Sequence, residues 1–268
     1  MQKTAFSISE RPLSGVSHAL DALELLAAGG GQPQPLAALA RALRMSKPGA
    51  HRLLLTLVAR GYVEHQLGGL YRLGLRAWEL GRSVPELGII AVAAQVMEDL
   101  TRATDESTIL GVLSGFETVY LHRVDAPQAV RVHTDVGSRL PGHCTSTGLA
   151  LLAALPKAEL AAILPPMLPP ISAESITSHD ALHRELERTR ARGYAMNRGG
   201  WRIDVAGVAA TILDPDGHPA GGLCIALPRY RATNARLQAL GGQVRGAANR
   251  IATALAGDGD VKLAGIAR

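Results

Sequence analysis

Two short apolar segments joined by a tight turn limit most strongly how this chain can fold. Their spacing predicts one helix over residues 36–43 and a second over 46–59, with a two-residue turn between them. Ser46 is a favourable N-cap for the second helix, and Pro48 falls in its first turn, where a missing backbone N–H has no cost. Ala40 is small enough to let the two helices cross closely. This pattern is typical of a helix-turn-helix.

An apolar helix and a hairpin flank this pair. Residues 16–28 have helical apolar spacing, which the three glycines at 29–31 end. Two strand-like runs surround Gly68 and Gly69, which supply the positive φ that a tight hairpin favours. The sequence therefore predicts a winged helix-turn-helix. The side chains of the first helix expected to face its core are Val16, Ala19, Leu20, Leu23 and Leu26.

Positive charge gathers in this part of the chain. Residues 1–76 hold nine of the 28 Lys and Arg but only four of the 23 Asp and Glu, so the other residues hold 19 of each sign. Between positions 41 and 63 there are five basic residues and no acid. Phosphate binding needs such a surface, because each neutralised phosphate releases counterions. A polyanion is therefore the expected partner of this quarter of the chain, and a merely solvated basic face is the plain alternative.

Five residues are candidates for contact with a double-stranded DNA operator. The second helix of the pair turns Leu53, Leu54 and Leu57 inward, which leaves its N-terminal end exposed. The candidates are Ser46, Lys47, His51 and Arg52 in that helix, and Arg72 in the hairpin. A single winged helix covers few base pairs, so we expect a homodimer or tetramer on a palindromic site.

The remaining chain has the pattern of an antiparallel α+β domain, with hairpins in sequence and helices at its ends. We expect strands over 107–113, 118–123, 130–134, 205–213 and 221–227. We expect helices over 88–103, 145–155, 179–192 and 233–255. The predicted organisation is a DNA-binding domain over 12–74, a linker helix over 75–87 and an effector-binding domain over 88–258. Within the linker, Pro85 ends the helical pattern.

These features resemble the isocitrate lyase regulator (IclR) family of bacterial transcription factors. The matching blocks of the first domain are 14–20, 46–47 followed by 51–57, 61–63 and 71–74, in the family's order and spacing. The resemblance continues through 137–143, 147–153 and 192–195. It implies a GAF/PAS-like effector domain that binds small organic ligands, often carboxylates from catabolic pathways, and dimers that pair into tetramers.

The chain departs from the family pattern at four places. Arg44 stands where the turn glycine is usual, and Pro48-Gly49 replaces the usual Ser-Thr of the recognition helix. Gly199-Gly200 occupies the place of an acidic pair, and Asp204 that of a common glycine. The family's DNA contacts at the first two places are therefore not carried over.

A candidate effector site opens the helix predicted over 145–155. The hydroxyls of Thr145, Ser146 and Thr147 and the free N–H groups of a first helical turn can hold an anion, although one of them can equally be a simple N-cap. By the resemblance, the pocket is lined by Leu140, Ser146, Thr147, Asn197, Val205, Gly207, Cys224 and Ala226. The small or apolar members of this set favour a small organic anion with a hydrophobic body and leave room for an aromatic ring. Cys224 is expected to be a packing residue.

Three other functions are weighed against this one. An enzyme would use His143 and Cys144 as base and nucleophile, yet adjacent residues on an extended loop point apart and no oxyanion motif accompanies them. A metal sensor would use His122, His133 and His143, which have no carboxylate partner at ligand spacing. A constitutive nucleoid-type binder would not need a charge-balanced domain of this length.

Composition sets the remaining expectations. The hydrophobic share of 47% and charged share of 19% suit a well-cored protein, and no apolar run approaches the roughly 20 residues that span a bilayer. The first residues do not read as a secretory signal, so we expect a cytoplasmic location and no membrane partner. Cys144 and Cys224 lie far apart in sequence, which favours free thiols and neither a metal nor a cofactor.

Overall fold

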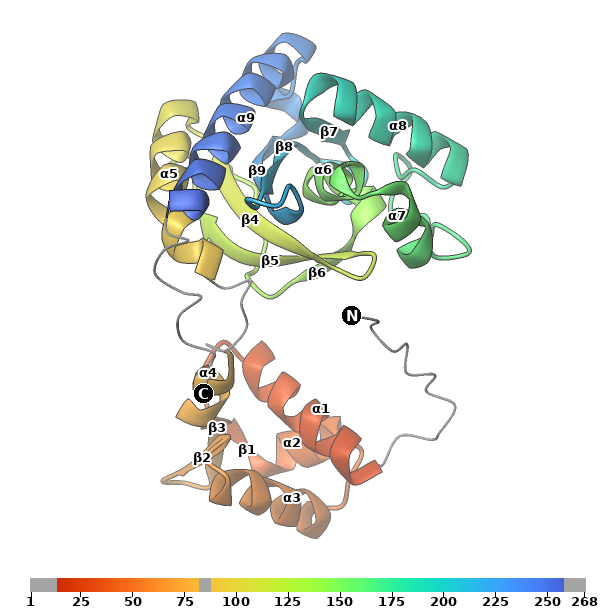
Figure 1. Ribbon diagram of the computed structural model, residues 1–268. Helices are drawn as coiled ribbons and strands as arrows, with labels where there is room; N and C mark the ends of the chain where they lie inside the picture. The colour runs from red at the N-terminus through yellow and green to blue at the C-terminus, as the bar shows by residue number, and fades with distance from the viewer. Residues whose placement is uncertain (1–13, 82–87, 258–268) are drawn as a thin grey trace. The chain divides into compact units, whose positions relative to one another are not determined.

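The computed structural model describes residues 14–81 and 88–257. The chain divides into two units, residues 1–85 and 86–268. Figure 1 shows helices around a small sheet in the first unit and a larger curled sheet between helices in the second. This confirms the predicted α+β class, with an N-terminal helix-turn-helix and a C-terminal antiparallel-sheet domain. Within the described residues, no helix is both long and apolar enough to cross a membrane.

The first unit is a helical bundle with a three-stranded antiparallel sheet of order β1-β3-β2. The Ser46 hydroxyl caps α3 by accepting a hydrogen bond from the Gly49 N–H at 3.3 Å. Gly68 and Gly69 have φ values of +85° and +74° at the hairpin turn, which fits their predicted role. The elements are α1 (Ser14–Ala28), β1 (Gln34–Pro35), α2 (Leu36–Ala42), α3 (Lys47–Ala59), β2 (Val63–Gln66), β3 (Leu70–Leu73) and α4 (Leu75–Gly81).

The buried face of α1 is only partly the predicted one. Leu26 is buried as expected, and so is Ala22, which the prediction did not include. Val16 and Leu20 were expected in the core but are each 55% exposed. The helix carries apolar side chains around more of its circumference than the core of this unit covers, and spacing alone does not show which part is covered. The predicted linker helix corresponds to α4, and its residues after Gly81 lie outside the described range.

The second unit is built on a six-stranded antiparallel sheet of order β6-β5-β4-β9-β8-β7. Its strands are β4 (Ser107–Ser114), β5 (Glu117–Val124), β6 (Arg139–Pro141), β7 (Ala195–Arg198), β8 (Val205–Leu213) and β9 (Pro219–Pro228). Its helices are α5 (Gly88–Thr104), α6 (Ser146–Ala154), α7 (Lys157–Ile163), α8 (His179–Arg192) and α9 (Asn234–Gly257), with short 3₁₀ turns η2 (Gly142–Cys144) and η3 (Arg229–Arg231).

Helices cover both faces of this sheet (Figure 1). Side chains of a strand alternate between its faces, and β9 shows the result. Leu223 and Ile225 pack in a core with residues of α5 and α9. Cys224 and Ala226 pack in a second core with residues of α6 and α8. The second face therefore carries the start of α6, where the effector site is predicted.

The prediction of a strand over residues 130–134 is wrong. This segment forms no strand, yet Val132 and Thr134 are each only 5% exposed. Their alternation with exposed residues produced a strand-like pattern, but the buried side chains face the protein interior from an irregular loop and not from a sheet. The short β1, β6 and β7 and the helix α7 were not predicted. The bounds of α8 match the prediction, because Ser178 caps its start and Gly193 ends it with φ +77°.

The turn of the helix-turn-helix contains a conformation that arginine disfavours. Arg44 has φ +53°, in the left-handed region where a side chain costs about 1–2 kcal/mol. We expect Arg44→Gly to raise the free energy of unfolding by up to about 1 kcal/mol, since relief of this strain exceeds the added chain entropy of glycine. Urea denaturation measures the change. Arg44→Ala keeps the strain, so equal stabilisation by both variants would contradict this explanation.

Candidate DNA-binding surface and effector cavity

The N-terminal end of α3 brings together four of the five predicted DNA-contact residues. Lys47 and Arg52 are exposed, and His51 is half-buried one turn after Lys47. Neither Lys47 nor Arg52 forms an ion pair with another described residue, so their charges are available to a ligand. The hydroxyl of Ser46 is already used by the helix cap. Cations at this end of an exposed helix are suited to contact phosphates and base edges.

Arg72 lies apart from this group, on the hairpin of β2 and β3. It faces Glu64 across the hairpin, and its Nη2 lies 2.7 Å from Glu64 Oε2. Both side chains are about half exposed, which makes this a weak surface pair. Arg72 can therefore reach a phosphate only in competition with Glu64, an obstacle that sequence spacing did not reveal.

A cavity lies between the start of α6 and the sheet face formed by β4, β5, β8 and β9. Its volume is about 40 Å³, and it is partly open to solvent. It is lined by Ile109, Tyr120, Val132, Thr134, Cys144, Thr145, Ser146, Asn197, Trp201, Arg202, Val205, Ala206, Gly207, Cys224 and Ala226.

The structure brings six of the eight predicted pocket residues to this cavity. They are Ser146, Asn197, Val205, Gly207, Cys224 and Ala226. Leu140 is half-buried on β6 and packs in the core beside α6, outside the lining. Thr147 is also absent from the lining: its hydroxyl is buried, and its methyl group faces Gly222 of β9. What Thr147 can offer to a ligand is its backbone N–H in the first turn of α6.

The simple N-cap role belongs to Thr145. Its hydroxyl accepts a hydrogen bond from the Gly148 N–H at 2.9 Å. Ser146 Oγ instead lies 3.3 Å from Cys224 Sγ at the cavity wall. Gly207 makes this approach possible, because a Cβ at that position would lie 2.7 Å from Ser146 Oγ.

Tyr120 and Arg202 belong to the cavity but were not predicted. Tyr120 is 5% exposed, and burial raises the pKa of its phenol, so the group is a neutral hydrogen-bond donor. Arg202 binds Asp204 through Nε at 3.2 Å and Nη2 at 2.8 Å. This arginine lowers the pKa of Asp204. The inward alternation of residues in β5 was the available signal for Tyr120, whereas the loop that carries Arg202 has no periodic pattern.

His143 and Cys144 do not form a nucleophile–base pair. They lie in a 3₁₀ turn and not in the extended loop that was expected. His143 Nε2 is 3.0 Å from the Pro169 carbonyl oxygen, and its ring stacks on Phe116. Cys144 Sγ is 3.9 Å from Ser175 Oγ, and burial raises the pKa of its thiol, which opposes activation.

The three histidines considered for a metal have separate surroundings. His133 Nε2 lies 3.0 Å from Asp135 Oδ1, His122 is on β5, and His143 is buried beside Pro169. In residues 14–81 and 88–257, no group of three or more His, Cys, Asp or Glu side chains could hold a metal ion.

Comparison with known proteins follows the same division of the chain. The model of the IclR helix-turn-helix domain matches residues 15–67, and that of the bacterial transcriptional regulator IclR C-terminal domain matches residues 81–253. The chain is 33% identical to the probable transcriptional regulator SauR of Cupriavidus necator over 85% of this chain and 92% of that protein. It is 32% identical to the regulator KdgR of Escherichia coli over 80% and 82% of the two chains.

Solved structures show the same architecture. An IclR homologue from Microbacterium hydrocarbonoxydans complexed with 4-hydroxybenzoate has a TM-score of 0.78 and 28% identity, with coverage of 90% of this chain and 98% of that one. The Thermotoga maritima IclR structure has a TM-score of 0.73 and 25% identity at the same coverage.

A helix-turn-helix unit followed by a sheet domain with a side-chain-lined cavity defines the class of transcriptional regulators that join DNA binding to an effector domain. The chain belongs to the IclR family of bacterial transcriptional regulators. Its relatives are named as regulators, so its function is to bind DNA and control transcription and not to catalyse a reaction.

The exposed end of α3 leads to a test of base reading. We expect Arg52→Ala to weaken operator binding by about 1–3 kcal/mol and to relax specificity at one base pair, because Arg52 is exposed there and has no ion-pair partner among the described residues. Fluorescence anisotropy with operator and single-base variants measures both effects. Arg60→Ala removes the same charge at the other end of α3 and is the matched control. If the two variants bind all sequences alike, Arg52 does not read a base.

Proposed function

We propose that this regulator binds a small organic carboxylate in the cavity beside α6 and thereby controls a catabolic operon. The observation that carries this proposal is the position of the cavity, which has the first turn of α6 in its wall. The first N–H groups of a helix have no acceptor within the helix, and the helix dipole favours negative charge there. The proposed anion donors are the N–H groups of Ser146 and Thr147 together with the Ser146 hydroxyl at the cavity wall.

Other lining groups favour the same ligand chemistry. Tyr120 offers a neutral phenol, Asn197 an amide, and Arg202 the cation at this cavity. The opposite wall is apolar or small and includes Ile109 and Val205. An anionic head with an apolar body fits this division, as is usual for sites that orient a ligand by few polar groups.

The cavity must widen to take an aromatic acid. The cavity volume is about 40 Å³, far less than an aromatic ring needs. Trp201 and Arg202 are on a loop between β7 and β8 and are not fully buried, so their side chains can move at low cost. The ligand in the Microbacterium structure is 4-hydroxybenzoate, an aromatic carboxylate, which supports a ligand of this class here.

We further propose that the protein binds a palindromic operator as a homodimer or a pair of dimers, and that it works in the cytoplasm, where bacterial DNA lies. Two recognition helices must be spaced by about 34 Å or a multiple to read successive turns of one DNA face. The first unit exposes apolar side chains that a partner copy would cover. They are Val16 and Leu20 on α1, and Leu75 and Leu80 on α4.

The ligand proposal is tested by a thermal-shift screen of mono- and dicarboxylates, including 4-hydroxybenzoate, followed by calorimetry of the best compound. We expect an acid to bind and Ser146→Ala to weaken it about tenfold, since a hydrogen bond to a charged group contributes about 1.5–3 kcal/mol. Thr147→Val should leave affinity nearly unchanged, because that hydroxyl does not line the cavity. A best ligand that is cationic, or full affinity in Ser146→Ala, would refute the anion site at α6.

The dimer proposal is tested by Leu20→Glu. A charge in the α1 surface should raise the dimer dissociation constant by at least about tenfold, because burial of an unpaired carboxylate is costly. Sedimentation velocity measures the effect. Leu67→Glu is the control, since Leu67 is 99% exposed at the hairpin tip. A monomeric wild type, with and without DNA, would contradict the proposal.

A further inference from the structure

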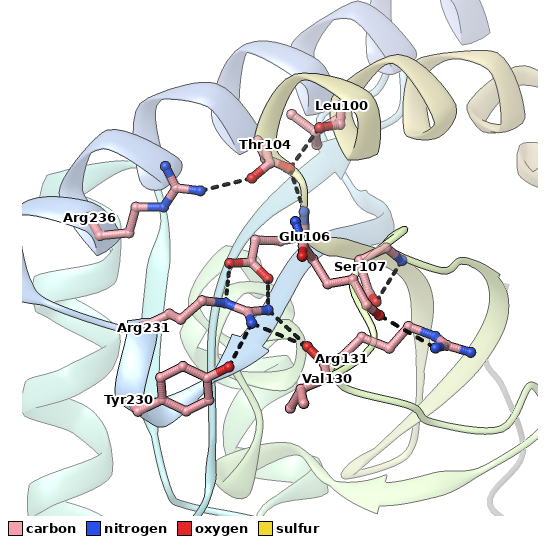
Figure 2. A network of polar contacts seen from close by, with 11 residues as sticks. Leu100, Thr104, Glu106, Ser107, Val130, Arg131, Tyr230, Arg231 and Arg236 are labelled. Carbon is pink, nitrogen blue, oxygen red and sulfur yellow. Dashed lines mark hydrogen bonds and ion pairs between the residues drawn. The ribbon is translucent and has the colours of Figure 1, made fainter.

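One arginine connects three segments of the effector unit that are distant in sequence. Arg231, the last residue of η3, donates from Nε to Glu106 Oε1 at 2.9 Å and from Nη2 to Glu106 Oε2 at 2.6 Å (Figure 2). Glu106 is 3% exposed and lies in the turn between the end of α5 and the start of β4. Two parallel bonds to a buried carboxylate fix both the position and the plane of the guanidinium.

The same guanidinium holds the loop that covers the cavity. Its Nη1 and Nη2 each lie 3.2 Å from the Val130 carbonyl oxygen, and Nη1 lies 2.9 Å from Tyr230 Oη. Val130 belongs to the loop 125–138, which forms no strand and therefore lacks a sheet ladder to hold it. Two residues further along, Val132 lines the cavity. The bonds to Val130 thus anchor one wall of the proposed effector site.

The other side of this network reaches the end of α5. Arg236, in the first turns of α9, donates from Nη2 to the Thr104 carbonyl oxygen at 2.8 Å (Figure 2). Thr104 Oγ1 in turn donates to the Leu100 carbonyl oxygen at 2.7 Å. α5 is the first described helix after residues 82–87, which join the effector unit in sequence to the DNA-binding unit. The end of α5 and the loop 125–138 are therefore both connected to the pair formed by Arg231 and Glu106. Of the described helices of the effector unit, α5 is the nearest in sequence to the DNA-binding unit.

We propose that Arg231 is a positioning residue that couples the loop 125–138 to the C-terminal end of α5. When the loop moves away, the guanidinium loses its bonds to Val130. Its pairing with Glu106 then transmits this change to the turn between α5 and β4. This proposal uses the effector cavity of the proposed function, but the coupling itself is a property of the protein without ligand. Lysine at position 231 could reach Glu106 but could not bond both Glu106 and Val130 in one plane.

The test compares hydrogen exchange in wild type and Arg231→Lys without ligand. We expect protection to fall at least about tenfold in two separate segments, 129–134 and 100–106, because both depend on the same guanidinium. Arg192→Lys is the matched control: Arg192 Nη2 lies 2.6 Å from Glu185 Oε1 on α8, away from both segments. Loss of protection in 129–134 alone, or an equal loss in Arg192→Lys, would overturn the proposal.

If Arg231→Lys does not fold, Arg236→Gln provides the same test from the α5 side. It removes the bond from Arg236 to the Thr104 carbonyl oxygen, and we expect loosened exchange to spread from 100–106 to 129–134. Confinement to 100–106 would overturn the coupling.

A second arm measures operator affinity with and without 4-hydroxybenzoate. If this probe binds the wild type, Arg231→Lys should still bind it, while the change in operator affinity that it causes falls to less than about twofold. A change as large as that of the wild type would refute the proposal. If the probe and the other acids do not bind the wild type, the proposed effector class fails and the exchange result alone decides the coupling.

Discussion

The close approach of α6 to the surrounding backbone is the constraint on which the effector unit depends. A Cβ at Gly148 would lie 2.3 Å from the Gly142 carbonyl oxygen, so α6 can pack against η2 only with glycine there. Gly207 allows Ser146 the same proximity to β8. These two glycines place the first turn of α6 directly at the sheet. The cavity, with its helix N-terminus on one side and strand side chains on the other, exists because of this contact.

Local signals in the sequence were sufficient to predict an element wherever capping residues fix its ends. Ser178 and Gly193 cap the two ends of α8, and Ser46 caps the start of α3. The cavity residues on regular strands, such as Gly207 and Cys224, were also found, through the family resemblance. Prediction failed where tertiary packing decides the outcome. No local pattern shows that a strand-like run at 130–134 would become a loop beside a cavity, or that Thr147 would be buried outside the cavity lining.

Charge is used differently in the two units. In the effector unit, most arginines form ion pairs with acidic residues of the same unit, as Arg229 does with Glu174 and Arg231 with Glu106. Such pairs leave little net field, which agrees with the balanced charge of residues 77–268. At the start of α3, Lys47 and Arg52 have no acidic partner among the described residues. Lys47 and Arg52 are therefore available to a polyanion, whereas paired arginines such as Arg229 and Arg231 are neutralised within the effector unit.

An effector changes DNA binding only if it binds two conformations unequally. The cavity as it stands admits little more than water, so a bound acid requires a different position of at least one wall. Both irregular walls are attached to η3: Arg231 holds the Val130 carbonyl, and Arg229 donates to the Ile203 carbonyl oxygen at 3.2 Å, beside Arg202. Because η3 leads directly into α9, movement of either wall acts on the same short turn. The three residues of η3 therefore connect both irregular walls of the cavity to the start of α9, which packs in the core on the opposite face of the sheet.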